Sequence, residues 1–409
     1  MTKRILYVTT TFPTLAWFLE NEVYRLRRRG FDVRVVTLRR VSTQHQPEHA
    51  ELVTITRAMG SPADPRAWLA LLGWLVRRPH VLVPEVVRIL WASRRSGYAL
   101  AGHAGYLPAA ARIASLVERE GFDQVHGAWA HFPATVAYLA ARLTRRPFSM
   151  AGHAGGDIHR TQAFLGQKVR AAEFVTACVR ENAETLRRLG GPGARVEWIY
   201  HGVDLGRFDG RGRRRAERPM LLTVGRLAAT KGFDVAIRAL ALLKARGLAP
   251  RLVMAGDGPL RARLESLATE LGVRDQVEML GAVDHEVILP LYRSAWTLVM
   301  PSVQLASGAR DGIPNVVVES MAMGMPCVGS RAAGLPEIIV HGENGLLCEP
   351  GDPVSLADAI ETLLRDPARI DALGARSRAR VVEEFDTDRN IERLVTLFGA
   401  PAREPAGAR

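Results

Sequence analysis

Cysteine is scarce in this sequence, which has three cysteines among 409 residues. Cys178, Cys327 and Cys348 lie far apart and form no C-x-x-C pair. An odd number of widely spaced cysteines argues against a disulfide framework and against a cysteine-based zinc site. This usage fits a reducing compartment.

Long apolar runs are also lacking. The longest one, residues 68–76, is too short to span a bilayer. Threonines and Pro13 interrupt the apolar stretch near the N-terminus, and no A-x-A site follows it, which argues against a signal peptide. We therefore expect a cytoplasmic protein.

Lysine is rare although the chain is basic. Only four of the 55 basic residues are lysines, and the 42 acidic residues leave a net charge of +13. Such an excess of arginine indicates a codon bias, and no aromatic-basic module is present, so we expect no nucleic-acid partner. A basic surface still favours other anionic partners.

Several common enzyme motifs are absent. The chain contains no GxGxxG, GxxxxGK[ST], GxSxG or HExxH sequence. These absences argue against nicotinamide and flavin oxidoreductases, P-loop enzymes, α/β-hydrolases and zincins.

The chain instead alternates short apolar strands with amphipathic helices. Residues 5–8 and 33–38 read as strands, and Leu19, Val23 and Leu26 between them have helical spacing, which predicts a β-α-β unit. The alternation continues in both halves, and 409 residues suit two domains. We predict an α/β protein of two Rossmann-like, doubly wound domains that face each other across a cleft.

Composition sets the expected boundaries. The first domain is residues 1–210, with a helical, Trp- and Arg-rich insertion at about residues 60–115; the second is residues 211–385. The Gly- and Arg-rich stretch 206–219 predicts a linker. A helix at 386–400 is expected to cross back to the first domain, and residues 401–409 to be disordered.

Charged residues gather where strands of the second domain end. Arg226 and Lys231 flank a loop between a predicted strand and a helix N-terminus, an arrangement that suits a diphosphate. A solvated loop is the alternative, but a lysine at this position is notable in a chain with four. The glycines of residues 255–259 could let the backbone approach a ligand, or form a plain turn.

Two carboxylates belong to the same region. Asp311 precedes a predicted helix that begins near Asn315, and Glu319 lies just over one turn inside it, so both can border one crevice. Asp311 could instead cap the helix. Glu319 is flanked by apolar residues and needs a partner.

The order of these motifs resembles that of a known family. GRLxxxKG (225–232), AGDGP (255–259), PS (301–302), a carboxylate-x7-Glu pair (311–319), GLPEII and GENGLL follow one another. The set resembles the family-4 retaining glycosyltransferases of the GT-B fold, of the exopolysaccharide and colanic-acid type. First-domain segments around residues 11–22, 126–132, 151–157 and 199–204 are similar to family motifs.

The resemblance implies roles for the second-domain residues. Arg226 and Lys231 would hold the diphosphate of a nucleotide-sugar and stabilise the leaving group, which removes the need for a metal or another cofactor. Glu319 would accept hydrogen bonds from the ribose, and the helix at Asn315 would offer N–H groups to phosphate. Asp311 would contact the sugar, although the family commonly has Glu there.

The resemblance also assigns His153 of the first domain to the donor sugar, near the reacting centre. A similar A-G-H-A-G segment at His103 follows no predicted strand and is discounted. Transfer with retention is implied, and the departing phosphate would take the acceptor proton.

The acceptor is expected to be a hydroxyl of a glycan or of a lipid-linked carrier. In the insertion, two Trp-containing apolar clusters end in the arginine pairs 77–78 and 94–95, which suits helices that contact an anionic membrane peripherally. The alternative is that these helices pack on the first domain. Other readings are a nucleotide-sugar 2-epimerase-like enzyme, a glycosyltransferase of small natural products and a non-catalytic partner subunit.

Overall fold

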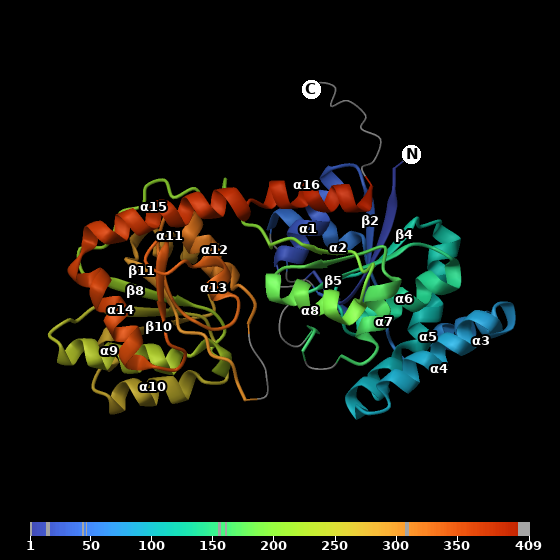
Figure 1. Cartoon of the computed structure of the whole chain (residues 1–409), viewed down its shortest axis with the longest axis horizontal. Coiled ribbons are helices and arrows are strands. Elements are labelled where there is room, and N and C mark those ends of the chain that lie inside the picture. Colours follow the sequence, from blue (N-terminus) through green and yellow to red (C-terminus); the bar gives the residue numbers. More distant parts are fainter. Residues whose placement is uncertain are drawn as a thin grey trace, which may run out of the picture. The chain divides into compact units, whose positions relative to one another are not determined.

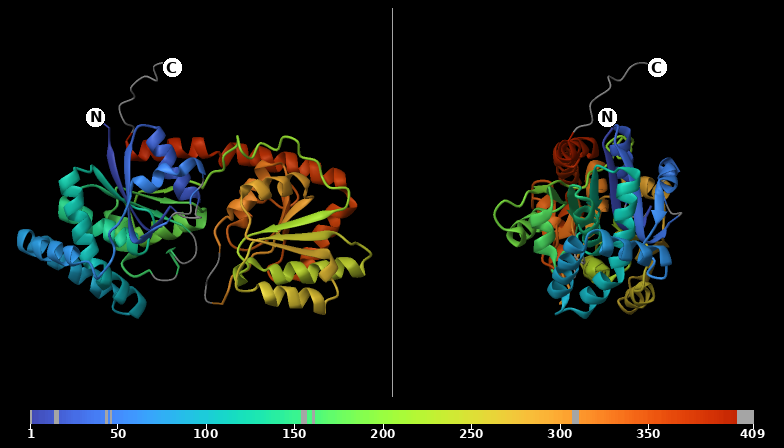
Figure 2. Two further views of the ribbon diagram at one scale, coloured as in Figure 1. Left: turned by 180° about the vertical axis from the view of Figure 1, so that it is seen from behind. Right: turned by 90° about the vertical axis from the view of Figure 1, so that its right-hand side faces the viewer.

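The computed structural model describes residues 2–13, 17–42, 45, 47–153, 157–159, 162–306 and 311–399. The chain forms two compact units, one of residues 1–200 with 391–409 and the other of residues 201–390. The predicted tail, residues 401–409, lies outside the described residues. Each unit is a parallel sheet with helices on both sides, as Figures 1 and 2 show, which confirms the predicted α/β class with two doubly wound domains.

The first unit is built on a seven-stranded parallel sheet in the order β3-β2-β1-β4-β5-β6-β7. Its strands are β1 (Arg4–Phe12), β2 (Asp32–Val41), β3 (Thr56–Ala58), β4 (Gln124–Gly127), β5 (Phe148–Gly152), β6 (Phe174–Ala177) and β7 (Val196–Trp198). Its helices are α1 (Trp17–Arg28), α2 (Glu51–Thr54), α3 (Pro65–Arg77), α4 (Pro79–Ser93), α5 (Gly97–Glu120), α6 (Phe132–Thr144), α7 (Leu165–Ala171) and α8 (Arg180–Gly190).

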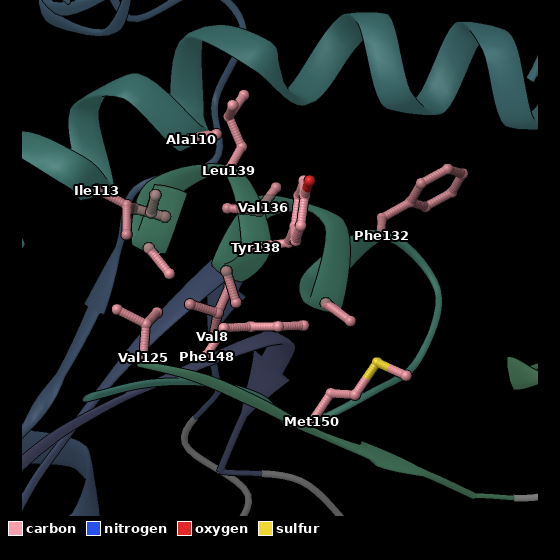
Figure 3. Close-up of a cluster of buried hydrophobic side chains, with 14 of the residues drawn as sticks. Val8, Ala110, Ile113, Val125, Phe132, Val136, Tyr138, Leu139, Phe148 and Met150 are labelled. Carbon is pink, nitrogen blue, oxygen red and sulfur yellow. The ribbon is translucent and has the colours of Figure 1, made fainter. Parts of the chain in front are cut away.

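Alternate residues of β1 enter two separate cores. Leu6 and Val8 pack with α5 and α6, whereas Ile5 and Tyr7 pack with α1 and with α16 (Thr387–Phe398). Figure 3 shows the first of these cores, in which strand side chains meet those of α5 and α6. Burial on both faces explains why these strands are apolar throughout.

The second unit has a six-stranded parallel sheet in the order β10-β9-β8-β11-β12-β13. Its strands are β8 (Met220–Val224), β9 (Arg251–Ala255), β10 (Val277–Gly281), β11 (Thr297–Met300), β12 (Cys327–Ser330) and β13 (Gly345–Cys348). Its helices are α9 (Phe233–Ala245), α10 (Arg261–Glu270), α11 (His285–Ser294), α12 (Asn315–Ala322), α13 (Leu335–Ile338), α14 (Pro353–Arg365) and α15 (Pro367–Glu384). In Figure 1, α9, α10 and α14 lie on one side of the sheet and α11, α12 and α15 on the other.

The Arg-rich stretch that the sequence suggested as a linker packs on the second unit. The Arg214 and Ala216 amides donate to carbonyls at the end of α11, and the Arg213 guanidinium donates to the Ala295 carbonyl at 2.7 Å. Burial lowers the pKa of Arg213 to about 10. In the structure the second unit begins at residue 201, whereas the sequence predicted a boundary after residue 210.

Candidate functional site

The strand order of the second unit reverses between β8 and β11. In open parallel sheets, ligands bind beyond the carboxyl ends of the strands at such a point. The loops that follow these two strands touch, because the Val303 amide donates to the Thr230 carbonyl at 2.9 Å. Gly232 has φ +62°, and a Cβ there would meet the Pro301 carbonyl oxygen at 2.0 Å, so only glycine fits.

An ion pair joins these two loops. The Lys231 Nζ lies 3.1 Å from the Asp311 Oδ2, and about a fifth of each side chain is exposed. Lys231 ends a 3-10 turn, Ala229–Lys231, which precedes α9. The structure therefore brings together two residues that the sequence placed 80 positions apart.

Arg226 belongs to the same loop as Lys231 and is exposed. Within the described part of the chain, its guanidinium has no hydrogen bond or ion pair. Asn315 is the first residue of α12 and is exposed, and no described side chain caps this helix. Asp311 thus pairs with a lysine instead of acting as the helix cap, and among the described residues no side chain accepts from the first N–H groups of α12.

The glycines of residues 255–259 pack against the Arg226 loop. A Cβ at Gly256 would lie 1.9 Å from the Gly225 carbonyl oxygen, and one at Gly258 would lie 2.7 Å from the Leu227 carbonyl oxygen. The Leu227 amide donates to the Asp257 carbonyl at 3.0 Å. These glycines let two loop backbones touch each other. Contact with protein therefore explains why glycine stands at both positions, and no ligand is needed for that explanation.

Glu319 has the partner that an apolar helix requires. Its Oε2 accepts a 2.8 Å hydrogen bond from the Tyr292 hydroxyl of α11. Burial raises the pKa of Glu319 to about 7, although the Tyr292 hydrogen bond and the charge of Arg207 act in the opposite direction. Glu319 as a whole residue is still partly exposed.

His153 belongs to the first unit and directly follows β5. Its Nε2 lies 2.9 Å from the Ala128 carbonyl oxygen, and because a carbonyl only accepts, this nitrogen is the donor. The ring packs against Phe18 and Trp129, and burial lowers the pKa of His153. Residues 154–156 of the same motif lie outside the described residues.

Asp157 ties the His153 loop to the turn between β4 and α6. Its Oδ2 accepts from the His153 amide at 2.9 Å, and its Oδ1 accepts from the amide and the Nδ1 of His131 at 3.0 and 2.9 Å. Burial alone would raise the pKa of Asp157, but the hydrogen bonds and charge of His131 outweigh it and the pKa is lowered.

A buried lysine supports the same turn from α7. The Lys168 ammonium donates to the carbonyls of Ala130 and His131 and, at 3.0 Å, to the Thr135 Oγ1. Thr135 in turn contacts the Nε2 of His103, whose Nδ1 contacts the Ser93 hydroxyl. His103 is buried within the first unit, so the A-G-H-A-G segment around it has a structural role. Burial lowers the pKa of Lys168 to about 7, despite the charge of Asp157.

Four polar residues of these sites were not identified from the sequence. Tyr292 donates to Glu319 and the charge of Arg207 acts on its carboxyl group, whereas Asp157 and Lys168 support the His153 loop. Lys168 did carry a signal, since it is one of only four lysines in the chain. Nothing in the local sequence distinguishes Tyr292 or Arg207.

Two family models together match most of the chain. The Glycosyltransferase Family 4 model matches residues 16–207, and the Glycosyl transferases group 1 model matches residues 208–380.

Curated proteins show the same likeness. A GDP-mannose-dependent alpha-(1-6)-phosphatidylinositol monomannoside mannosyltransferase of Mycolicibacterium smegmatis is 29% identical over 74% of this chain and 85% of its own length. The amylovoran biosynthesis glycosyltransferase AmsK of Erwinia amylovora is 31% identical over 49% of this chain, and the match spans only 50% of AmsK.

Among solved structures, Anabaena Alr3699/HepE in complex with UDP and glucose aligns with a TM-score of 0.73 at 19% identity, over 98% of this chain and 100% of that one. This likeness supports the GT-B fold. The family models, the two parallel sheets and the ordered motifs agree, and the chain belongs to the family-4 glycosyltransferases of the GT-B fold.

Proposed function

We propose that this glycosyltransferase moves a sugar from a nucleotide-diphosphate-sugar to a hydroxyl group of a glycan or of a lipid-linked acceptor, with retention of anomeric configuration. The observation that carries the proposal is the Lys231–Asp311 ion pair at the point where the strand order reverses. Lys231 shares its loop with the exposed Arg226. That HepE is described with UDP and glucose supports a nucleotide-sugar donor.

The second unit supplies the groups that this donor needs. Arg226, Lys231 and the first N–H groups of α12, at Asn315, would bind the diphosphate. Glu319 would accept hydrogen bonds from the ribose hydroxyls and Asp311 from hydroxyls of the sugar. Asp311 is suited to this because Lys231 already holds its carboxylate in place.

The same cations would lower the barrier to reaction. As the bond from the sugar to the diphosphate breaks, negative charge grows on the leaving oxygen, and fixed positive groups stabilise that charge. The acceptor hydroxyl then attacks on the leaving-group side, and the departing phosphate takes its proton. His153, in the first unit, would lie against the sugar.

We propose that Arg226 and Lys231, which we call the diphosphate clamp, act without a metal. Turnover should then persist in excess EDTA, because Lys231 and Arg226 supply the positive charge that a divalent cation supplies elsewhere. A strict need for added Mg²⁺ or Mn²⁺ would contradict this part of the proposal.

The acceptor class is inferred from the names of two relatives. AmsK acts in amylovoran biosynthesis and the mycobacterial relative acts on a phosphatidylinositol mannoside, which favours polysaccharide or glycoconjugate biosynthesis. In the described part of the chain, no helix is long and apolar enough to cross a bilayer. We propose that the enzyme works in the cytoplasm, in peripheral contact with the membrane.

One experiment separates this function from its alternatives. Release of nucleoside diphosphate is measured for a panel of nucleotide-sugars with and without candidate acceptors, and the anomeric configuration of the product is read by NMR. Acceptor-dependent release with retention supports the proposal. Release without an acceptor would indicate an epimerase-like enzyme, and an inverted product or no release from any donor would contradict the proposal.

A further inference from the structure

The insertion exposes most of the large apolar side chains that the described residues leave open to solvent. On α3, Trp68, Leu69, Leu72 and Val76 are 51–81% exposed. On α4, Val83, Val87 and Trp91 are 46–66% exposed and recur every four residues, so they form one stripe. We call these seven residues the apolar face.

The opposite sides of both helices are already buried. Trp74 of α3 is 1% exposed and its Nε1 donates to the Ala111 carbonyl of α5 at 3.0 Å. Leu82 and Ile89 of α4 are also buried, and the Glu85 carboxylate accepts from the Tyr138 hydroxyl of α6 at 2.6 Å. Figure 1 shows α3 and α4 at the outer edge of the first unit, beyond α5. Packing on the first unit therefore accounts for one side of each helix only.

Helices that are apolar all round are normally covered on every side. These two are covered on one side by α5 and α6 and present a second apolar side to solvent. An exposed apolar side of this size indicates a binding partner, and the charges around it indicate the chemistry of that partner.

Positive charge surrounds the apolar face, whereas its acidic neighbours are neutralised. Residues 61–100 contain six arginines and two carboxylates. Asp64 pairs with Arg112, and Glu85 is buried with Arg88 and Arg142. The exposed guanidiniums of Arg66 and Arg95 have no ion pair among the described residues.

The sequence assigned the arginine pairs 77–78 and 94–95 to membrane contact, but in the structure Arg77 and Arg78 have other partners. Arg77 pairs with Glu118 at 2.9 Å, and Arg78 donates to the Leu143 carbonyl at 2.6 Å, so both fasten α3 to the fold. Arg94 instead stacks on exposed Trp91, with 4.0 Å between the guanidinium carbon and the ring centroid. Paired aromatic and cationic groups of this kind suit the boundary between water and lipid headgroups.

We propose that the apolar face of α3 and α4, with Arg66, Arg94 and Arg95, docks on an anionic lipid bilayer. The apolar side chains enter the headgroup region while the guanidiniums meet lipid phosphates. Docking stands on the exposed side chains and charges alone. The consequence that the acceptor is presented from the bilayer rests on the proposed function.

The test is co-sedimentation of the full chain with phosphatidylcholine vesicles that contain or lack phosphatidylglycerol. We expect binding only to the anionic vesicles, and weaker binding in high salt. Val87→Ser with Trp91→Ser, and Trp68→Ser with Leu72→Ser, should each weaken binding roughly tenfold or more. Arg66→Ser and Arg95→Ser should each weaken it by about fivefold.

Matched controls use exposed residues of the second unit. Val354→Ser with Val382→Ser, and Arg263→Ser with Arg376→Ser, remove the same kinds of side chain elsewhere and should leave binding unchanged. Thermal melting and nucleoside diphosphate affinity show that each variant is folded. A variant that fails these checks is replaced by single substitutions at the same positions.

Three results would overturn the docking proposal. They are no binding of the wild type to anionic vesicles at low salt, equal losses in the control variants, and a concentration-dependent dimer that the apolar-face variants abolish, since the occupant would then be a second copy of the chain. Sugar transfer to water-soluble glycans and to detergent-dispersed lipid-linked acceptors, assayed without vesicles, tests the proposed function separately. Docking without transfer would refute only that function, and transfer without docking would refute only the docking.

Discussion

The Lys231 ammonium and the Asp311 carboxylate form an ion pair, with 3.1 Å between Nζ and Oδ2, at the reversal of the strand order in the second unit. The pairing gives Asp311 two opposed effects on a donor. Its charge offsets part of the positive charge that would attract a diphosphate, and in the proposed function its carboxylate accepts from sugar hydroxyls.

Asp311→Asn should therefore separate the complete donor from the nucleotide. We expect nucleoside diphosphate to bind as tightly as to the wild type or a few-fold more tightly, because Lys231 loses a competing anion. The nucleotide-sugar should bind roughly tenfold more weakly, since charged hydrogen bonds contribute about 1.5–3 kcal/mol. Titration calorimetry with both ligands measures this. Glu319→Gln is the comparison and should weaken both ligands alike, whereas equal losses in Asp311→Asn would remove Asp311 from the sugar site.

Glu319 should make the stability of the protein depend on pH in a defined window. Its pKa is about 7 in the folded protein and 4.5 for an unperturbed glutamate side chain, so the folded state holds the proton more tightly than the unfolded chain. The stabilisation by this proton is complete below pH 4.5 and is lost as the pH rises through 7.

Glu319→Gln removes that loss, so the variant should gain stability relative to the wild type between about pH 5 and 8. The gain is at most about 3 kcal/mol, because each pKa unit corresponds to about 1.4 kcal/mol and the residue is partly exposed. Denaturant unfolding of both proteins across this range gives the difference. A pH-independent difference would show that Glu319 has an ordinary pKa.

Lys168 should act on His153 through the turn that it supports. Lys168→Met removes the donor to the Ala130 and His131 carbonyls, and a lost buried hydrogen bond costs about 1–3 kcal/mol. Because Ala128 in the same turn fixes the His153 ring, we expect kcat to fall at least about tenfold. Nucleoside diphosphate affinity should not change, since the proposed diphosphate site belongs to the second unit.

Lys244→Met is the matched control, because Lys244 is exposed and should alter neither quantity. The pH profile of kcat distinguishes positioning from general destabilisation: a displaced His153 should shift it, whereas a less stable but correctly arranged protein should keep it. An unchanged kcat and pH profile in Lys168→Met would contradict the supporting role.

Local sequence pattern predicted the fold and the positions of the candidate residues along the second unit. The strand–loop–helix order placed Arg226 and Lys231 after β8, and the apolar setting of Glu319 correctly required a partner. The partner itself, Tyr292, lies on α11, 27 residues away, and only tertiary packing brings the two together. The same holds for Arg77, whose ion pair with Glu118 joins α3 to α5 across 41 residues.

Glycine was harder to interpret. A glycine pattern shows that something approaches the backbone closely, but not whether it is a ligand or protein. At Gly256 it is the Gly225 carbonyl. Similarly, the sequence showed that the insertion is apolar and basic, whereas only the folded arrangement shows that Trp74 is buried and Trp91 exposed.

Lys231 and Arg226 are proposed to bind and neutralise the diphosphate of a nucleotide-sugar during transfer, and the proposed function depends on this clamp above all. The most direct test is steady-state turnover of Lys231→Ala and Arg226→Ala, with Lys244→Ala as the matched control and thermal melting to verify folding. Loss of one group that stabilises developing charge costs about 10²–10³-fold in kcat. We predict a loss of at least about 10²-fold in each clamp variant and none in the control. Full turnover in a folded Lys231→Ala or Arg226→Ala protein would contradict the clamp.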